Sequence, residues 1–293
     1  MLHRFDAPAS DGDFPDPAPA GDDVLARYLV RIGYAGPVAP TLDTLAALQA
    51  AHQAAIPFEA MDALTGEGVD IDPRAIEAKL IDRRRGGYCF EQNGLFLRVL
   101  QTIGFAAEGL LGRVRWMLPD DAPPTGRTHM VVRVTIDGRG WLADVGFGAT
   151  VPPQPLALGD ALPQPTRHES YRVQPLDTGY RVEAEIAGAW KTLYDLEAAP
   201  APAIDYEIGN WYTSQHPSSH FRHQLVAART TAEARHGLRD NRLTIRHVGG
   251  VIEQRYLSAD EIEAALADIF LLTPEPGWRR AIERAATTAE IQA

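Results

Sequence analysis

The spacing of apolar residues along the chain predicts a helical first third. Up to residue 104, apolar positions recur at the intervals of amphipathic helices, with glycine and proline between the segments. Asp72 and Pro73 suit the N-cap and the first position of a helix, and Gly104 suits the residue just after one. The expected helices span residues 23–32, 41–55, 73–82 and 89–103.

After residue 104 the pattern changes to the alternating and β-branched sequences that are typical of strands. The Asp137-Gly138 dipeptide is a signal for a tight hairpin turn. Ser258, with Glu261 three residues later, predicts a capping box at the start of a late helix. The expected strands span residues 107–118, 130–136, 141–145, 171–175, 179–186, 190–194, 242–247 and 251–256, and the late helix spans 259–270.

This order of elements predicts an α+β fold with an N-terminal helical bundle, a central antiparallel β-barrel and a C-terminal α/β lid. A hairpin signal at Gly249-Gly250 belongs to the lid. The segment before the first helix is rich in proline, aspartate and alanine, which predicts a disordered leader. The expected parts are the leader over 1–22, the bundle over 23–105, the barrel over 106–211, and an interdomain segment with the lid over 212–293.

The composition argues against several classes of protein. The formal net charge is −11, whereas binding to nucleic acid requires clustered lysine and arginine. The run from Arg83 to Arg85 still leaves room for a small anionic ligand. One cysteine cannot form an internal disulfide framework, and no apolar run reaches transmembrane length. The N-terminus also lacks the apolar core of a secretory signal, so we expect a cytoplasmic protein with no membrane partner.

The only cysteine, Cys89, lies in the stretch RRGGYCFEQNGLF at the predicted start of a helix. A helix N-terminus favours the thiolate, which is the nucleophilic form of cysteine. Gly86 and Gly87 allow a sharp turn whose free N–H groups could bind a developing oxyanion. A lone cysteine is more often a buried packing residue. The stretch by itself therefore leaves both interpretations open.

A nucleophilic cysteine needs a base and a group that orients the base, and His129 and Asp144 flank the Asp137-Gly138 turn. If that turn has two residues, the residue numbers of each cross-strand pair add up to 275, and Asp144 lies opposite Val131. His129 is then on the same face as Asp144 and diagonal to it. An Asp–His pair is therefore a reasonable prediction. The alternative is that Asp144 caps a loop and His129 is an ordinary strand residue.

The other histidines suggest a metal only weakly. The HPSSHFRH stretch over 216–223 has histidines at spacings that could suit a metal ion, but it contains no cysteine or carboxylate. We prefer to interpret it as a loop with incidental histidines, and we expect no metal. His52 lies on a predicted amphipathic helix, so we expect it to be a hydrogen-bonded residue of the helix face.

Together these segments resemble the arylamine N-acetyltransferase family. RRGGYCFEQN resembles the family's active-site signature, THMVVRV its histidine segment and WLADVGFG its aspartate segment. IPFEAMD and NWYTSQHPSSHF resemble two more of its segments, and all five occur in the family's order between about residues 48 and 221. The resemblance implies a catalytic triad of Cys89, His129 and Asp144. It also implies that the bundle and the barrel are arranged as in a cysteine protease.

The resemblance further implies a ping-pong reaction in which acetyl-CoA, as the acyl-donor substrate, acetylates Cys89. An arylamine or hydrazine nitrogen then accepts the acetyl group, while His129 handles the proton. Phe58 and Phe221 match acceptor-pocket positions that Trp116 could join, with plain core packing as the alternative. The other matched positions are Gly146, Phe147 and Gly148 in the coenzyme A loop, Thr128 and Ser218 near the cofactor, and Glu59 with Arg84 or Arg85 as a structural ion pair.

Two positions depart from the family pattern. Ala60 stands where the family usually has asparagine, and Ala149 follows Gly148 where many members have another glycine. Neither belongs to the triad. The second leaves the preference among acyl-CoA donors open, although the backbone N–H groups of the loop remain.

Three other functions fit the same residues. An amide synthase of the same family would join an aromatic amine to a carrier-bound polyketide acyl group. A hydrolase or a transglutaminase-like enzyme shares the Cys–His–Asp order, and a binding module would keep the fold without the activity. For the preferred enzyme the expected partners are a small arylamine or hydrazine and a coenzyme A thioester. We expect a monomer or a homodimer.

Overall fold

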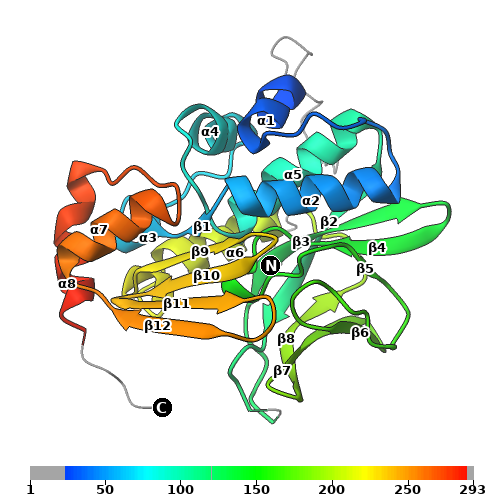
Figure 1. Cartoon of the computed structure of the whole chain (residues 1–293). Coiled ribbons are helices and arrows are strands. Elements are labelled where there is room, and N and C mark those ends of the chain that lie inside the picture. Colours follow the sequence, from blue (N-terminus) through cyan, green and yellow to red (C-terminus); the bar gives the residue numbers. More distant parts are fainter. Residues whose placement is uncertain (1–23, 120, 289–293) are drawn as a thin grey trace, which may run out of the picture.

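The computed structural model describes residues 24–119 and 121–288, so the leader expected over 1–22 lies outside the described residues. The described part contains a group of N-terminal helices, a seven-stranded antiparallel sheet and a five-stranded antiparallel sheet. Figure 1 shows α1, α2, α4 and α5 together above the two sheets. The predicted α+β fold class is confirmed.

The N-terminal helices begin and end where the capping residues predicted. Thr41 caps α2 by accepting a hydrogen bond from the Thr44 N–H, and Asp72 caps α4 in a similar way, with Pro73 at the first position. Gly104 follows α5 in the left-handed conformation, with φ of 100°. The helices are α1 (Val24–Ile32), α2 (Leu42–Ala55), α3 (Met61–Thr65), α4 (Pro73–Glu77) with a π-helical turn (Ala78–Asp82), and α5 (Cys89–Ile103).

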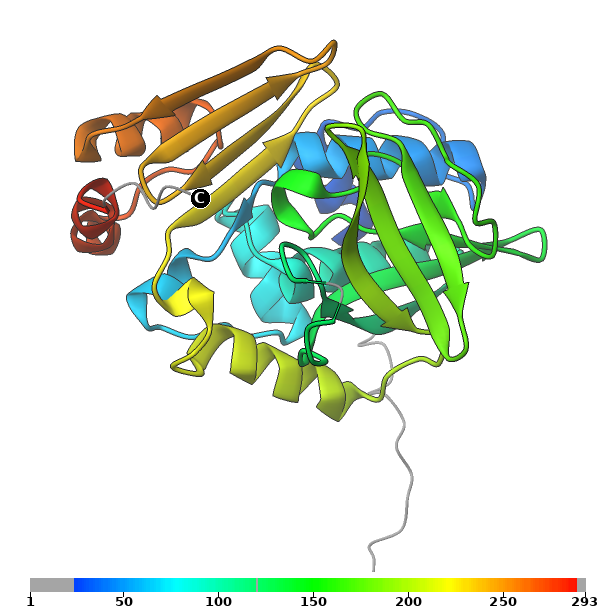
Figure 2. The same ribbon diagram turned by 90° about the horizontal axis from the view of Figure 1, so that it is seen from below.

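The seven-stranded sheet curves around its own apolar core, as Figure 2 shows. Its strand order is β5-β4-β3-β2-β8-β7-β6, and all neighbours are antiparallel. The Asp137-Gly138 turn has two residues, because Ile136 pairs with Arg139. The strands are β2 (Ala106–Val114), β3 (Arg127–Ile136), β4 (Arg139–Ala143), β5 (Leu156–Ala157), β6 (Tyr171–Leu176), β7 (Gly179–Ile186) and β8 (Ala189–Glu197).

The five-stranded sheet has the order β1-β9-β10-β11-β12, so a strand from the N-terminal third forms one of its edges. Two C-terminal helices, α7 and α8, pack on one face around Leu238 and Leu243 (Figure 1). The predicted capping box of Ser258 and Glu261 is present at the start of α7. These elements are β1 (Phe58–Glu59), β9 (Val226–Thr230), β10 (Ala234–Arg239), β11 (Arg242–His247), β12 (Ile252–Tyr256), α7 (Ala259–Asp268) and α8 (Arg279–Ala286).

A further helix, α6 (Ala203–Gln215), contains the expected boundary between residues 211 and 212. The sequence did not predict it, because its large apolar residues Ile208 and Trp211 are exposed while Gly209 and Asn210 are buried. The helix can pack closely because Gly209 leaves room for the Phe90 ring. Neither α6 nor any other helix in the described residues is long and apolar enough to span a membrane.

Candidate active site

Three elements bring Cys89, His129 and Asp144 together. Cys89 is the first residue of α5, His129 lies on β3, and Asp144 directly follows β4. All three are buried, with exposed fractions of 5%, 2% and 0%. His129 Nε2 is 2.8 Å from Asp144 Oδ2, and the nearby Cys89 thiol is one of the groups that raise the pKa of the imidazole. The sequence predicted these residues as one group, and the structure brings them together in one buried site.

The loop before Cys89 needs its glycines. A side chain at Gly86 would collide with the Pro57 carbonyl, and one at Gly87 would have its Cβ 2.9 Å from the Glu91 Cβ. Glu91 Oε2 accepts a hydrogen bond from the Tyr88 N–H at 3.0 Å, which fixes the start of α5. The close packing of this loop therefore holds the cysteine at the N-terminus of the helix.

The β3–β4 hairpin sets the relative position of His129 and Asp144. Val132 pairs with Ala143, so the strands have the predicted register, in which the residue numbers of each pair add up to 275. Burial disfavours a charged imidazole, but the Asp144 carboxylate outweighs burial and raises the pKa of His129 to about 9. Burial also acts against the Asp144 charge, yet His129 and the other donors hold the pKa of Asp144 below its ordinary value. A charged pair is therefore favoured at neutral pH.

Four donors hold the Asp144 carboxylate. Oδ2 accepts hydrogen bonds from His129 Nε2 and, at 2.9 Å, from the Tyr194 hydroxyl. Oδ1 accepts from Asn93 Nδ2 at 3.0 Å and from the Gly146 N–H at 2.8 Å. These bonds compensate the loss of hydration that a buried carboxylate suffers. They also fix the carboxylate oxygen that orients the imidazole.

Sequence reasoning missed Asn93 and Tyr194. Asn93 lies four residues after Cys89 on the same helix, and its Oδ1 accepts from the Val145 N–H at 3.0 Å. That spacing places both residues on one helix face, so the CFEQN stretch contained a usable signal. Tyr194 comes from β8, fifty residues after Asp144. No local pattern links it to the site.

Three of the residues expected near a cofactor lie beside the thiol and the imidazole. Cys89 Sγ donates a hydrogen bond to the Thr128 carbonyl oxygen at 3.4 Å. The Phe147 ring contacts the His129 ring with 4.9 Å between centroids. Gly146 approaches so closely that a Cβ there would lie 2.7 Å from Cys89 Cα. The segment after β4 therefore forms one wall of the site.

Phe58 and Phe221, expected at an acceptor pocket, pack in the same apolar cluster as Cys89. Their ring centroids are 6.0 Å apart, and Phe221 lies 5.9 Å from the Tyr88 ring. A Cβ at Gly148 would lie 3.8 Å from the Phe58 ring, so the loop after β4 borders the same rings. An aromatic surface thus extends from the cysteine to Gly148.

Two expected site residues lie elsewhere. Trp116 packs with the core of the seven-stranded sheet, in the cluster that also includes Phe147. Ser218 is exposed after α6, and its hydroxyl hydrogen-bonds with Tyr212 at 3.0 Å and with His216 at 2.8 Å. Those bonds do not connect Ser218 with the Cys89 cluster.

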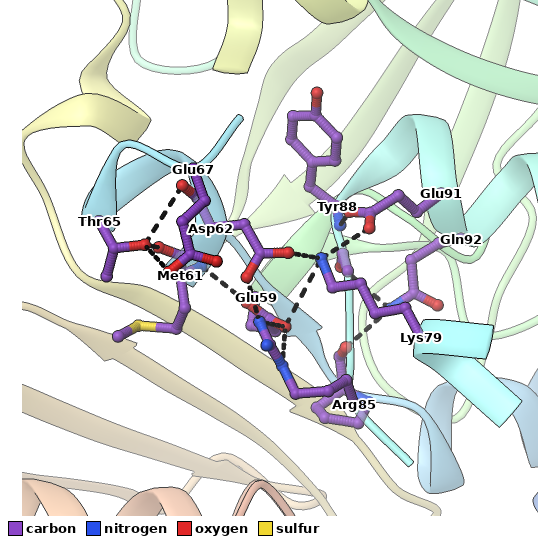
Figure 3. Close-up of polar contacts among 12 residues, drawn as sticks. Glu59, Met61, Asp62, Thr65, Glu67, Lys79, Arg85, Tyr88, Glu91 and Gln92 are labelled. Carbon is purple, nitrogen blue, oxygen red and sulfur yellow. Dashed lines mark hydrogen bonds and ion pairs between the residues drawn. The ribbon is translucent and has the colours of Figure 1, made fainter. Parts of the chain in front are cut away.

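Behind the cysteine loop lies a buried network of charges (Figure 3). Lys79 Nζ lies 2.6 Å from carboxylate oxygens of both Asp62 and Glu91. Arg85 lies 2.7 Å from both Glu59 and Asp62, which confirms the predicted pair with Glu59 and identifies Arg85, not Arg84, as its partner. These contacts join β1, α3 and the π-helical turn to the start of α5.

The network contains more negative than positive charge. Glu59, Asp62 and Glu91 share the two cations Lys79 and Arg85, and Arg85 also pairs with the exposed Glu275 at 2.9 Å. Burial, with repulsion from Glu59, outweighs the attraction of Lys79 and raises the pKa of Glu91 to about 7. Glu91 can therefore take up a proton near neutral pH.

Two other histidines of the described residues, His52 and His223, have structural hydrogen-bond partners. His52 is buried and bonds through its two ring nitrogens to the Tyr28 hydroxyl and to Gln92 Oε1. His223 Nε2 bonds to the Pro217 carbonyl within the HPSSHFRH loop. Over residues 24–119 and 121–288, no group of three or more His, Cys, Asp or Glu side chains is arranged to hold a metal ion.

Gly146→Ala should disturb this site more than its size suggests. The added methyl group would lie 2.7 Å from Cys89 Cα and 2.8 Å from Asn93 Nδ2, so the loop and α5 would have to separate. We expect a loss of about 1–3 kcal/mol in the free energy of unfolding. We also expect slower alkylation by iodoacetamide, which reports on Cys89 alone because the chain has one cysteine. The control is Gly277→Ala, where a Cβ meets nothing within 4 Å, and an equal response of both variants would contradict the prediction.

The geometry is that of a nucleophilic acyl-transfer enzyme, with a thiol at a helix start, a histidine against it and a buried carboxylate behind. A family model described as N-acetyltransferase matches residues 41–275. The arylamine N-acetyltransferase of Mycolicibacterium smegmatis is 44% identical over 250 residues, which cover 84% of this chain and 90% of that protein. The chain belongs to the arylamine N-acetyltransferase family, whose members are acyltransferases.

Solved structures support the same assignment. The arylamine N-acetyltransferase structure from Mycobacterium tuberculosis has a TM-score of 0.85 and 38% identity, covering 89% of this chain and 99% of that chain. The Mycobacterium marinum enzyme in complex with CoA has a TM-score of 0.84 and 39% identity, covering 89% of this chain and 98% of that chain. The predicted family is therefore confirmed.

Proposed function

We propose that the protein transfers an acetyl group from acetyl-CoA to the nitrogen of an arylamine or arylhydrazine through an acetyl-Cys89 intermediate. The observation that supports this most directly is the buried His129–Asp144 pair, 2.8 Å apart, beside the only cysteine, which helps to raise the pKa of the imidazole. A relative of 39% identity has been solved in complex with CoA, which supports a coenzyme A thioester as the donor.

In the first half-reaction, His129 takes the thiol proton and the Cys89 thiolate attacks the thioester carbonyl carbon. A new carbon–sulfur bond forms, and the carbonyl electrons move to oxygen. The N-terminus of α5 favours both the thiolate and the developing oxyanion, because its first N–H groups point toward the site. The oxyanion then collapses, the bond to the coenzyme A sulfur breaks, and His129 returns its proton to that sulfur.

In the second half-reaction, the amine nitrogen attacks the acetyl-Cys89 carbonyl carbon. His129, neutral again, takes the proton of the nitrogen as the new carbon–nitrogen bond forms. The tetrahedral intermediate expels the Cys89 thiolate and leaves an amide. Asp144 remains ionised throughout and keeps Nδ1 of His129 directed at the reacting atoms, because Nε2 is bound to the carboxylate.

The substrates would bind on both sides of the thiol. For coenzyme A we propose Thr128, the loop of Gly146, Phe147 and Gly148, and Ser218. For the aromatic acceptor we propose Phe58 and Phe221, with Trp116 as a further candidate from the cluster that also includes Phe147. The proximity of the two rings to Cys89 supports the acceptor assignment, since aromatic faces stack on a planar amine.

The proposal is tested by intact-mass measurement of the purified protein after incubation with acetyl-CoA alone. We expect one added acetyl group, absent in Cys89→Ala, and its disappearance when 4-aminobenzoate or phenylhydrazine is added. Free coenzyme A should form in step with the N-acetyl product. Absence of both the adduct and amine-dependent coenzyme A release would overturn the proposal.

Two other results would point to the alternatives. Acylation of Cys89 only by a carrier-bound acyl group would identify an amide synthase. Coenzyme A release at the same rate with and without amine, with free acetate as the product, would identify a hydrolase. The same samples distinguish all three, because the adduct, the amide and the acetate are measured separately.

A further inference from the structure

The five-stranded sheet ends in an exposed strand, β12. It is the last strand in the order β1-β9-β10-β11-β12, and Figures 1 and 2 both show it at the outer border of that sheet. All five of its residues are exposed, including Ile252 at 63% and Tyr256 at 46%. An exposed edge strand with apolar side chains is prone to pair with another strand.

The hydrogen bonds between β11 and β12 identify which backbone groups of β12 point outward. At the two ends of the pairing, the His247 N–H donates to the Val251 carbonyl and the Leu257 N–H donates to the Asn241 carbonyl, each at 2.9 Å. In an antiparallel pair, inward- and outward-pointing residues alternate along the strand. Odd-numbered residues of β12 therefore bond to β11.

The even-numbered residues Ile252, Gln254 and Tyr256 consequently direct their N–H and C=O groups away from the sheet. The side chains of Glu253 and Arg255 lie between them, on the other face of the strand. This edge thus presents three outward-pointing backbone pairs and two opposite charges in a fixed spacing, of which Glu253 also contacts His247 Nε2 of its own chain at 2.7 Å and stays 55% exposed.

We propose that β12 is a self-association surface, on which the β12 strand of a second copy of this chain pairs in antiparallel orientation about a two-fold axis at Gln254. In this register Gln254 lies opposite Gln254 of the partner subunit, and Ile252 lies opposite Tyr256 of the partner subunit. All outward-pointing groups then face one another. The two five-stranded sheets become one continuous ten-stranded sheet.

The charges select this register over its neighbours. With the axis at Gln254, Glu253 lies directly opposite Arg255 of the partner subunit, and the same pair forms again by symmetry. If the axis lay one residue earlier, the two Glu253 side chains of the dimer would face each other. If it lay one residue later, the two Arg255 side chains would face each other. Opposite charges in facing positions stabilise a strand pair and like charges destabilise it. The self-complementary order Glu-Gln-Arg therefore favours a second copy of the same strand.

The contact is small, so the dimer should be concentration-dependent. Two five-residue strands bury less than the roughly 1,200–2,000 Å² of a stable interface. The surface is also remote from the chemistry, since β12 lies at the opposite edge of the sheet from β1, which pairs with Gly87 of the cysteine loop. The inference is therefore independent of the proposed function, and activity per chain should not change with association.

Charge reversal provides the central test by sedimentation velocity over a range of protein concentrations. Glu253→Arg gives the strand two positive charges and Arg255→Glu gives it two negative charges, so each variant alone should dimerise roughly tenfold or more weakly than the unaltered protein. An equimolar mixture of the two variants should form a heterodimer, because every facing pair is again opposite in charge. Glu185→Arg makes the same charge change at an exposed position of β7 and should leave dimerisation unchanged.

Gln254→Pro tests the backbone contact without disturbing the protomer. The lost N–H points outward, so the pairing with β11 keeps its hydrogen bonds, and proline is tolerated at such edge positions. We expect loss of the dimer with an unchanged melting temperature. A monomer at every concentration, a dimer that survives Gln254→Pro, or a mixture of the two charge variants that stays monomeric would each overturn the proposal.

Discussion

Asp144→Asn should reduce the rate of Cys89 acetylation by about 10⁴-fold, the scale seen when the carboxylate of a nucleophile–histidine–carboxylate triad is neutralised. The carboxylate accepts four hydrogen bonds, and an amide must turn its NH₂ group toward two of those donors. His129 then loses the charge that raises its pKa, so the imidazolium–thiolate pair is no longer favoured. Burst measurements of coenzyme A release in a stopped-flow instrument would give the acetylation rate directly.

Tyr194→Phe is the matched control for this prediction. It removes one of the two hydrogen bonds to Oδ2 but keeps the negative charge and the bond to His129. We expect a change of less than about tenfold in acetylation, consistent with the loss of one net hydrogen bond. An Asp144→Asn protein that acetylates within tenfold of the unaltered chain would contradict the assigned role of the carboxylate.

The contact between His129 and Asp144 could be predicted because it depends on local rules. A two-residue turn at Asp137-Gly138 fixes the register of its strands, and the register fixes which side chains share a face. The position of Cys89 at a helix start was predictable for a similar reason, since the glycines before it and Gly104 after α5 mark the ends of the helix. These contacts join residues that are close in sequence or linked by one hairpin.

Other contacts could not be predicted, because they depend on how distant elements pack. Tyr194 reaches Asp144 only because β8 pairs with β2, whose far side pairs with β3. The helix α6 buries polar residues and exposes Ile208 and Trp211, so the usual rule that apolar residues face the core would assign its buried face incorrectly. Lys79 gave no signal at all, since a single lysine in a helix is usually exposed. The positions of Tyr194, α6 and Lys79 all depend on packing between elements that are distant in sequence.

Lys79→Met should lower the free energy of unfolding by about 3–5 kcal/mol at pH 8, because it leaves a buried carboxylate without its cation. Arg85 remains paired with both Glu59 and Asp62, so Glu91 is the acid that loses its partner. Adding Glu91→Gln to this variant should recover most of the loss. The glutamine oxygen can still accept the Tyr88 N–H, and position 91 no longer carries an unpaired buried charge. Urea unfolding followed by fluorescence provides the measurement.

The pH dependence of this effect follows from the raised pKa of Glu91. Its folded-state pKa is about 7, above the ordinary value of 4.5, so the stability that its proton contributes is fully present below pH 4.5 and is lost as the pH rises through 7. Without Lys79 the pKa rises further. The destabilisation by Lys79→Met should therefore be clearly smaller at pH 5 than at pH 8, and the double variant should show little difference between the two.

Arg279→Met separates the effect of burial from that of losing any ion pair. Arg279 makes a contact of 2.7 Å with Asp260, which is comparable in length with the 2.6 Å contact between Lys79 and Glu91. The Arg279 and Asp260 side chains, however, are 43% and 85% exposed. Water already solvates such a pair, so we expect a far smaller loss of unfolding free energy than for Lys79→Met at either pH. Equal losses for Lys79→Met and Arg279→Met would mean that the buried network does not stabilise the cysteine loop. A large, pH-dependent loss confined to Lys79→Met would mean that the charge balance around Glu91 fixes the start of α5, and with it the position of Cys89.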